Sequence, residues 1–228
     1  MASSFGWRRL AEQSRQMTFH DDVLAPRQKR ALRLLGPLMS RQAFYLAGGT
    51  AIALHLGHRR SVDLDWFTGN RVPDMLLLAR AIRDEGVPLG VRQIERGTIH
   101  GEIGRVPVTL LEYRYPLLQG LGQWRAYGCS VAALDDLACM KLSAITQRGA
   151  KKDFVDIYAL GSRHKPLAEL LSAYQRKYAI REVSHVLYAL AYFDDADRER
   201  MPKMLWDLDW RTIKRAIQGW IREFVGSR

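Results

Sequence analysis

Residues 43–67, AFYLAGGTAIALHLGHRRSVDLDWF, constrain the fold more than any other part of the sequence. The segment opens with a short apolar run that ends at Gly48 and Gly49, as expected of a buried strand followed by a tight turn. From Thr50 the pattern is typical of a short helix, which Gly57 would end. The SVDLDWF run then alternates polar and apolar residues, which indicates a second strand. The segment therefore predicts a strand–glycine–helix–strand unit.

Two aspartates, Asp63 and Asp65, belong to the second predicted strand. Because side chains alternate along a strand, we expect both carboxylates on one face, about 7 Å apart. Two ionised carboxylates on one face repel each other, so a cation beside them is favourable. Mg²⁺, or Mn²⁺ in its place, prefers oxygen ligands and often completes its coordination with substrate phosphates. The pair alone also fits an ordinary solvent-exposed strand edge.

The glycine turn adds a position for a phosphate. Backbone N–H groups at a helix N-terminus attract anions, and Gly48 and Gly49 let an anion approach the backbone closely. Thr50 adds a hydroxyl donor, although Gly-Gly-Thr by itself also fits a turn with a helix cap. Since the predicted unit brings Gly49 next to the aspartates, we expect one site that combines a phosphate cradle with a metal site.

Further elements follow from hydrophobic spacing. Helices are expected at about 24–40, with Pro37 as a kink or an end, and at 74–86, and strands at about 91–100 and 105–113. From about residue 133 the remaining pattern is helical.

This order predicts an α+β fold, a small mixed sheet with flanking helices followed by a helical C-terminal half. We place an α/β domain at residues 1–130 and a helical domain at 131–228, which contributes to the active-site cleft.

Charged residues of the helical half also suggest a site. Lys141 interrupts an apolar helix face, so it needs a phosphate or a carboxylate as partner unless it extends from the rim to solvent. Asp153 and Asp156, three residues apart, share a face of the next helix. That face is either part of a site or a solvated surface whose carboxylates pair with Lys151 and Lys152.

The formal net charge of +11, from 35 basic and 24 acidic residues, is compatible with a polyanionic partner, nucleic acid rather than a membrane, or with a merely basic protein. Cys129 and Cys139 lack a metal-binding neighbourhood, so we expect reduced packing residues and a cytoplasmic location. The N-terminal MASSFGWRRLAEQSRQ lacks the apolar core of a signal peptide, and no apolar run reaches the roughly 18 to 20 residues of a membrane span. The scattered histidines, His100 among them, indicate no site.

Two blocks of the sequence resemble the AbiEii-type nucleotidyltransferases, toxins of type IV toxin–antitoxin and abortive-infection systems within the DNA polymerase β-like nucleotidyltransferase superfamily. The first block matches the family at Gly48, Gly49, Thr50, Arg59, Ser61, Asp63, Asp65 and Phe67. The second, MKLSAITQRGAKKDFVDIYAL, looks like the downstream segment of the family at Lys141, Arg148, Gly149, Lys151 or Lys152, Asp153 and Asp156. Together the blocks span about residues 45–160.

The resemblance implies a metal-dependent nucleotidyltransferase that moves NMP from an NTP to a hydroxyl acceptor. The acceptor would be RNA, such as a tRNA 3′ end, or a protein hydroxyl, and a cognate antitoxin would be a partner. The implied residue roles are Mg²⁺ binding by Asp63 and Asp65, β/γ-phosphate binding by Gly48, Gly49 and Thr50, phosphate neutralisation by Arg59 or Lys141, and phosphate contact or orientation of Asp63 by Ser61.

A third metal carboxylate, usual on a later strand of the superfamily polymerases, has no clear counterpart. The corresponding position is Thr109, and Glu112 would lie on the opposite strand face unless a bulge turns it inward. Either Asp153 supplies the third acid and activates the acceptor, or the site uses two carboxylates. A degenerate, non-catalytic nucleotide- or RNA-binding protein is the alternative, and a basic DNA-binding regulator is a third, although no helix-turn-helix signature is evident.

Overall fold

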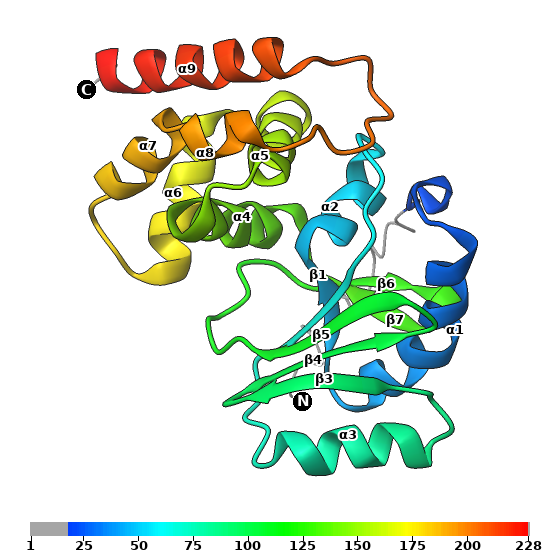
Figure 1. The fold of residues 1–228 in the computed structure, drawn as a ribbon. Helices are drawn as coiled ribbons and strands as arrows, with labels where there is room; N and C mark the ends of the chain where they lie inside the picture. Colours follow the sequence, from blue (N-terminus) through cyan, green and yellow to red (C-terminus); the bar gives the residue numbers. More distant parts are fainter. Residues whose placement is uncertain (1–17, 228) are drawn as a thin grey trace, which may run out of the picture.

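The computed structural model describes residues 18–227 of the 228-residue chain. A seven-stranded mixed sheet forms one part of the molecule, and most of the helices gather above one end of it (Figure 1). The predicted α+β class is therefore confirmed. The N-terminal segment in which we looked for a signal peptide lies outside the described residues.

The sheet has the strand order β3-β4-β5-β2-β1-β7-β6. Its strands are β1 (Tyr45–Ala47), β2 (Leu64–Thr68), β3 (Gly90–Glu95), β4 (Thr98–Ile103), β5 (Val106–Glu112), β6 (Gly122–Trp124) and β7 (Cys129–Val131). The helices are α1 (Pro26–Arg41), α2 (Gly48–Leu56), α3 (Met75–Asp84), α4 (Leu134–Arg148), α5 (Lys151–Arg163), α6 (Leu167–Tyr178), α7 (Ser184–Ala191), α8 (Asp194–Arg198) and α9 (Trp210–Gly226), with short 3₁₀ turns at Asp21–Val23 and Arg125–Tyr127.

The predicted strand–glycine–helix–strand unit is β1–α2–β2, at the centre of the sheet. β1 pairs antiparallel with β2 and parallel with β7, and β2 pairs parallel with β5. In this register Asp65 lies between Ala47 of β1 and Thr109 of β5. Asp65 thus lies in the middle of a row of paired residues that crosses the central strands of the sheet.

Several predicted boundaries were wrong. The expected strand at 91–100 is two antiparallel strands, β3 and β4, because Gly97 adopts a positive φ of 75° and turns the chain back. Pro37 does not end α1, since the apolar face of that helix, including Leu35 and Met39, is fully buried and holds the helix together past the proline. Both β6 and β7 went unpredicted, because strands of three residues are too short to show alternation.

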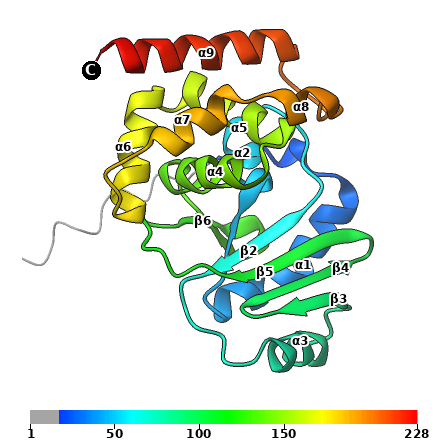
Figure 2. The same ribbon diagram turned by 60° about the vertical axis from the view of Figure 1, so that its left-hand side comes forward.

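One continuous hydrophobic core joins the sheet to the helices. It includes Leu46 of β1, Trp66 of β2, Leu137 of α4 and Phe154 of α5, each at most 1% exposed. In Figure 2, α2 and α4 lie between the sheet and the helices α5, α7 and α8, α9 crosses the top, and α3 lies at the opposite end of the sheet. The sheet ends at Val131 and α4 begins at Leu134. The division into domains at 130/131 stays a prediction.

Between residues 18 and 227, we find no helix with the length and apolar character that crossing a membrane requires.

Candidate active site

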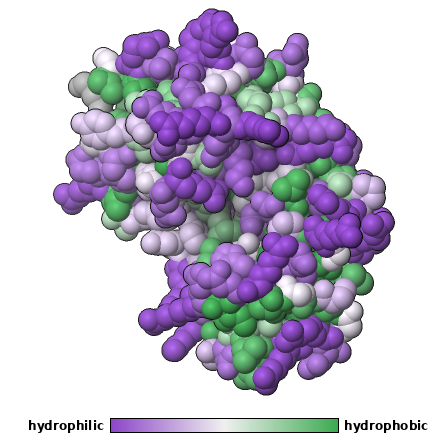
Figure 3. Space-filling model, viewed as in Figure 1, coloured by the Kyte–Doolittle hydropathy of each residue, from purple (hydrophilic) through white to green (hydrophobic). Residues whose placement is uncertain are grey.

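A cavity of about 580 Å³ lies between the sheet and α4. The space-filling view shows the surface hollowed between the helical part above and the sheet below (Figure 3). Of the predicted site residues, those that line the cavity are Gly48, Gly49, Arg59, Ser61, Asp63, Asp65 and Lys141. Thr50 and Asp153 are buried behind its wall. Both sequence blocks thus meet at one cavity.

The glycines lie in the first turn of α2, which begins at Gly48, two residues earlier than the sequence pattern indicated. Gly48 has a φ of 66°, which favours glycine, and no side chain caps the N-terminus of the helix. The first N–H groups of a helix have no intrahelical partner, and here they lie beside the cavity. This terminus can therefore accept an anion.

Both aspartates line the cavity, but only one of them lies in a strand. Asp65 belongs to β2, whereas Asp63 precedes the strand, which begins only at Leu64. The alternation predicted from Val62 onward therefore fails at its first position, where the Val62 side chain is 53% exposed. The hydroxyl of Thr50 donates a hydrogen bond to the carbonyl of Asp63, so this threonine holds the loop and its hydroxyl is already engaged.

Charge crowding distinguishes Asp65. Burial and the neighbouring charge of Asp63 raise the pKa of Asp65. Lys152 lies 3.7 Å from a carboxylate oxygen of Asp63, and the charges of Lys141 and Lys152 act on the pKa of Asp65 in the opposite direction to Asp63. Burial and the charge of Asp63 thus make the ionised form of Asp65 costly in the folded chain, and a cation bound beside it would offset that cost.

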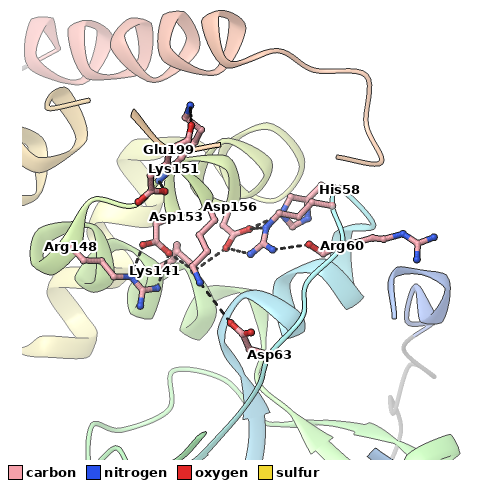
Figure 4. A network of polar contacts seen from close by, with 11 residues as sticks. His58, Arg60, Asp63, Lys141, Arg148, Lys151, Asp153, Asp156 and Glu199 are labelled. Atoms are coloured by element: carbon pink, nitrogen blue, oxygen red, sulfur yellow. Dashed lines mark hydrogen bonds and ion pairs between the residues drawn. The ribbon is translucent and has the colours of Figure 1, made fainter. Parts of the chain in front are cut away.

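A buried ion-pair network underlies the helical wall (Figure 4). Lys141 of α4 lies 2.8 Å from Asp153 and 2.9 Å from Asp156, both of α5 and both 0% exposed. The guanidinium of Arg59 donates to both carboxylate oxygens of Asp156, at 2.6 and 2.8 Å. His58 contacts the same carboxylate at 2.8 Å. The partner of Lys141 is thus a pair of carboxylates, and neither the solvated-face nor the rim-lysine alternative holds.

The network fixes the charge states of its members. Burial favours neutral Lys141, but the charges of Asp156 and Asp153 outweigh it and raise the lysine pKa. Burial likewise opposes ionisation of Asp156, yet Arg59, Lys141 and His58 hold its pKa well below the ordinary value. Burial lowers the pKa of His58, which favours the neutral imidazole. Lys141 and Arg59 therefore stay protonated in the cavity wall, paired with the buried carboxylates of Asp153 and Asp156.

Asp153, the predicted third acid, faces cations rather than the cavity. Lys141 donates to its Oδ1, and Arg148 donates to both of its oxygens at 2.8 and 3.0 Å. Although burial opposes ionisation, these partners lower the pKa of Asp153. The carboxylate is thus placed to position Lys141 and Arg148.

The C-terminal part of the chain also supports the site. The loop between α8 and α9 pairs with the segment that carries Arg59: the N–H of Arg60 donates to the carbonyl of Lys203, and the N–H of Leu205 donates to the carbonyl of His58. The helical half thereby fixes the backbone from which Arg59 reaches the cavity.

The strand row beside Asp65 contains no further acid. Thr109 of β5, the position at which a third carboxylate was looked for, is the cross-strand partner of Asp65 and hydrogen-bonds to it. Pairing of β5 with β2 continues without a bulge to Glu112, whose carboxylate accepts from the N–H of Val72 at 2.6 Å. Next in the row is His100 of β4, paired with Thr109 and lining the cavity, which the sequence analysis missed.

Comparison with known proteins identifies the family. The family model described as the nucleotidyl transferase AbiEii toxin of type IV toxin–antitoxin systems matches residues 33–123 and 92–219. The chain belongs to the AbiEii family. A protein of Aquifex aeolicus (strain VF5), the uncharacterized aq_aa25, is 33% identical over 206 residues, which cover 89% of this chain and 98% of that protein. The resemblance inferred from the two sequence blocks is therefore confirmed.

Solved structures show the same fold at low sequence identity. The nucleotidyltransferase toxin MenT4 from Mycobacterium tuberculosis superposes with a TM-score of 0.52 at 15% identity, over 85% of this chain and 81% of that one. JHP933 from Helicobacter pylori gives 0.51 at 15%, over 91% and 93%. The antibiotic-resistance factor ANT(2″)-Ia gives 0.51 at 14%, over 67% and 93%. The AbiEii match identifies this chain as a nucleotidyltransferase, and these structures agree with its fold.

The site fits a divalent cation whose coordination is completed partly by protein carboxylates and partly by oxygens of the substrate. Among residues 18–227, no group of three or more His, Cys, Asp or Glu side chains is arranged to hold a metal without other ligands. Asp63 and Asp65 nevertheless line one cavity, and their charges crowd each other. Mg²⁺ is commonly bound by one or two carboxylates plus phosphate oxygens. The donor set thus suits Mg²⁺ that arrives with a nucleotide.

Alanine at Gly48 tests the contact between the glycine turn and the aspartate pair. A Cβ at this position would lie 2.3 Å from an Asp65 carboxylate oxygen, on a residue whose φ of 66° already disfavours side chains. We expect Gly48→Ala to displace Asp65 and lower turnover about 10²-fold or more, because small misplacements at a reacting centre have effects of this size. The strained backbone should also cost about 1–2 kcal/mol of unfolding free energy.

Gly69→Ala is the matched control, since a Cβ there meets nothing within 4 Å and no positive φ is involved. Turnover and urea unfolding of both variants, measured with wild type, give the comparison. Equal turnover of Gly48→Ala and wild type contradicts the proposed contact.

Proposed function

We propose that this nucleotidyltransferase moves NMP from an NTP to a hydroxyl group of RNA, with Mg²⁺ as its metal and the 3′ end of a tRNA as the acceptor. The observation that carries the proposal is the meeting of Gly48, Gly49, Asp63, Asp65 and Lys141 at one cavity. A donor-lined helix terminus, an acidic pair and a fixed cation are the groups that a metal–triphosphate substrate requires. The net charge of +11 supports a polyanionic acceptor.

Each group has a defined task in this proposal. The N–H groups at Gly48 and Gly49 bind the β- and γ-phosphates, and Arg59 and Lys141 neutralise phosphate charge. Ser61, which also lines the cavity, contacts a phosphate. Mg²⁺ held by Asp63 and Asp65 would stabilise the charge that develops on the phosphoryl group. The acceptor oxygen bonds to the α-phosphorus while the bond to the bridging oxygen breaks, and pyrophosphate leaves with the electron pair.

We assign Asp153 a positioning role, which replaces our expectation of a third acid. Its carboxylate accepts hydrogen bonds from Lys141 and Arg148, both of which line the cavity. An ammonium group carries three donors, and Lys141 uses two of them on Asp153 and Asp156, which leaves one for a phosphate. Thr50 supports the site through the carbonyl of Asp63 and not through its hydroxyl on a phosphate.

The cellular role that we propose is that of a toxin with a cognate antitoxin protein, in the cytoplasm. The AbiEii family assignment supports the toxin role. Two buried free thiols, Cys129 and Cys139, are compatible with a reducing compartment.

Label transfer tests the activity. Purified protein is incubated with each α-³²P-labelled NTP and total RNA, with Mg²⁺ or with EDTA, and the RNA is resolved on a denaturing gel. We expect Mg²⁺-dependent labelling of RNA of tRNA length from at least one NTP. Transfer to protein and not to RNA would shift the acceptor to a protein hydroxyl, and absence of transfer to either contradicts the proposal.

One observation favours a second candidate, a nucleotide- or RNA-binding protein without catalysis. Thr109 occupies the strand position beside Asp65 where a third carboxylate is expected in this superfamily. The same assay separates the candidates, because the second predicts binding of nucleotide or RNA without transfer of label.

A further inference from the structure

His100 stands at the end of the strand row that carries the acidic pair. It belongs to β4 and pairs with Thr109 of β5, which in turn pairs with Asp65 of β2. Residues directly opposite each other on neighbouring strands project from the same face of the sheet. Asp65, Thr109 and His100 all line the cavity. The row therefore presents a carboxylate, a hydroxyl and an imidazole to one substrate-sized space.

The His100 ring is free to act on a substrate. It is half-buried, and within residues 18–227 no hydrogen bond, ion pair or ring contact engages it. His55, His58 and His164, by contrast, each contact a protein acceptor within 3 Å. An unpartnered imidazole in a cavity wall has both ring nitrogens available to a ligand.

Other proton acceptors of the cavity region already have partners or tasks. Asp63 and Asp65 are the proposed metal ligands. Glu112 accepts from the N–H of Val72 and faces Arg114 at 3.4 Å. The oxygens of Asp153 are engaged by two cations behind the wall. Among the described residues that line the cavity, His100 is thus the proton acceptor whose side chain makes no contact that proton transfer would break.

We propose that His100 is the general base of the transfer, which takes the proton from the acceptor hydroxyl. This inference rests on the proposed function and assigns the step that the missing third carboxylate leaves open. Histidine is the side chain that enzymes most often use for proton transfer. The imidazole thereby replaces an acid at Thr109 from the neighbouring strand, one position further along the same row.

The spacing suits this task. Neighbouring strands lie about 4.8 Å apart, so two steps along the row separate the backbones of His100 and Asp65 by about 10 Å. A reacting oxygen stands about 3.0–3.5 Å from the atom it attacks. It also stands about 2.6–3.2 Å from the base that takes its proton. A phosphoryl group held at the aspartate pair and an acceptor oxygen together fill this span.

The proposed step is balanced. The neutral imidazole nitrogen of His100 accepts the hydroxyl proton as the acceptor oxygen forms its bond to the α-phosphorus. The bond from that phosphorus to the bridging oxygen breaks, and its electron pair leaves with pyrophosphate. The imidazolium then returns its proton to solvent or to the leaving pyrophosphate.

Two substitutions separate proton transfer from mere contact. His100→Gln keeps a hydrogen-bonding side chain of similar reach but cannot accept a proton, and His100→Ala leaves space for free imidazole. With saturating NTP we expect both to lower turnover about 10²–10⁴-fold, the usual contribution of a general base. NTP affinity should stay within about twofold of wild type, and added imidazole should restore part of the His100→Ala turnover. His185→Gln, at an exposed position of α7, is the matched control.

The outcomes are distinguishable. Turnover of His100→Gln within about threefold of wild type overturns the inference, because contact without proton transfer would then suffice. So does a loss in His100→Ala that imidazole does not restore while the thermal melting curve matches wild type. Both results leave the proposed function intact, since the wild-type chain transfers label. A wild-type chain that transfers nothing instead removes the proposed function, and the base assignment falls with it.

Discussion

Asp65→Asn lowers nucleotidyl transfer by about 10³-fold or more while the fold persists. The substitution removes the carboxylate at the centre of the sheet that lines the cavity beside Asp63. A metal that stabilises phosphoryl charge contributes several kcal/mol, and each 1.4 kcal/mol corresponds to a factor of ten in rate. Loss of one of only two carboxylate ligands therefore removes most of the catalysis.

The same substitution should not destabilise the metal-free protein. Burial and the charge of Asp63 raise the pKa of Asp65, so its ionised form is less favourable in the folded than in the unfolded chain. A group with a raised carboxyl pKa costs stability above that pKa, and asparagine removes this cost at neutral pH. We expect the melting temperature of Asp65→Asn in EDTA to equal or exceed that of wild type.

Turnover by label transfer and melting by differential scanning calorimetry give the two readouts. Asp207→Asn, at an exposed position outside the cavity, is the control for loss of one negative charge. Wild-type turnover in Asp65→Asn removes the metal assignment. A lowered melting temperature in EDTA would show that Asp65 is ionised and well compensated without a cation, contrary to the crowding argument.

The central unit could be predicted because its signals are local. Glycines at 48 and 49, the helix that follows and the aspartates of the next strand lie within 18 residues, and turn chemistry and alternation specify each piece. Lys141 was also predictable, since a charge on an apolar stripe requires a partner. Its position 5% exposed between Asp153 and Asp156 satisfies that requirement.

His100 could not be found in this way because its significance depends on pairing. It is 35 residues from Asp65 in sequence, and the two meet in one row only through the β4–β5 hairpin and the parallel β5–β2 pair. The turn at Gly97, hidden inside what looked like one strand, sets that register. Sequence patterns also do not show hydrogen-bond partners. Thr50 and Asp153 were assigned roles from their residue types, but in the fold the Thr50 hydroxyl donates to the carbonyl of Asp63 and the Asp153 carboxylate accepts from Lys141.

Asp156→Asn should destabilise the fold by about 3–5 kcal/mol, the usual effect of removing one partner from a buried ion pair. Asp156 is 0% exposed and is shared by Arg59, Lys141 and His58. Without its charge, the guanidinium of Arg59 stays buried with no carboxylate on its Nε and Nη2. Lys141 retains its ion pair with Asp153, so the substitution should destabilise mainly Arg59 and the loop that carries it.

The effect should depend on pH with a defined sign. The folded-state pKa of Asp156 lies well below its ordinary value, so the unfolded chain binds more protons at acidic pH. Its stabilisation is therefore complete above the unfolded-state pKa of about 3.9 and is lost as the pH falls through the folded-state value. Asp153, whose pKa is also lowered, adds to the same window.

Urea unfolding between pH 7 and pH 2 tests both parts of this prediction. The free energy of unfolding of wild type should fall steeply below about pH 4. That of Asp156→Asn should be lower at pH 7 and fall less steeply below about pH 4, because one of the carboxylates responsible is absent. Asp195→Asn, exposed on α8, is the control and should follow wild type. A parallel pair of curves for wild type and Asp156→Asn contradicts the assignment of this charge to Asp156. A decrease of less than about 1 kcal/mol in the unfolding free energy of Asp156→Asn at pH 7 would mean that water replaces the carboxylate as the hydrogen-bond partner of Arg59.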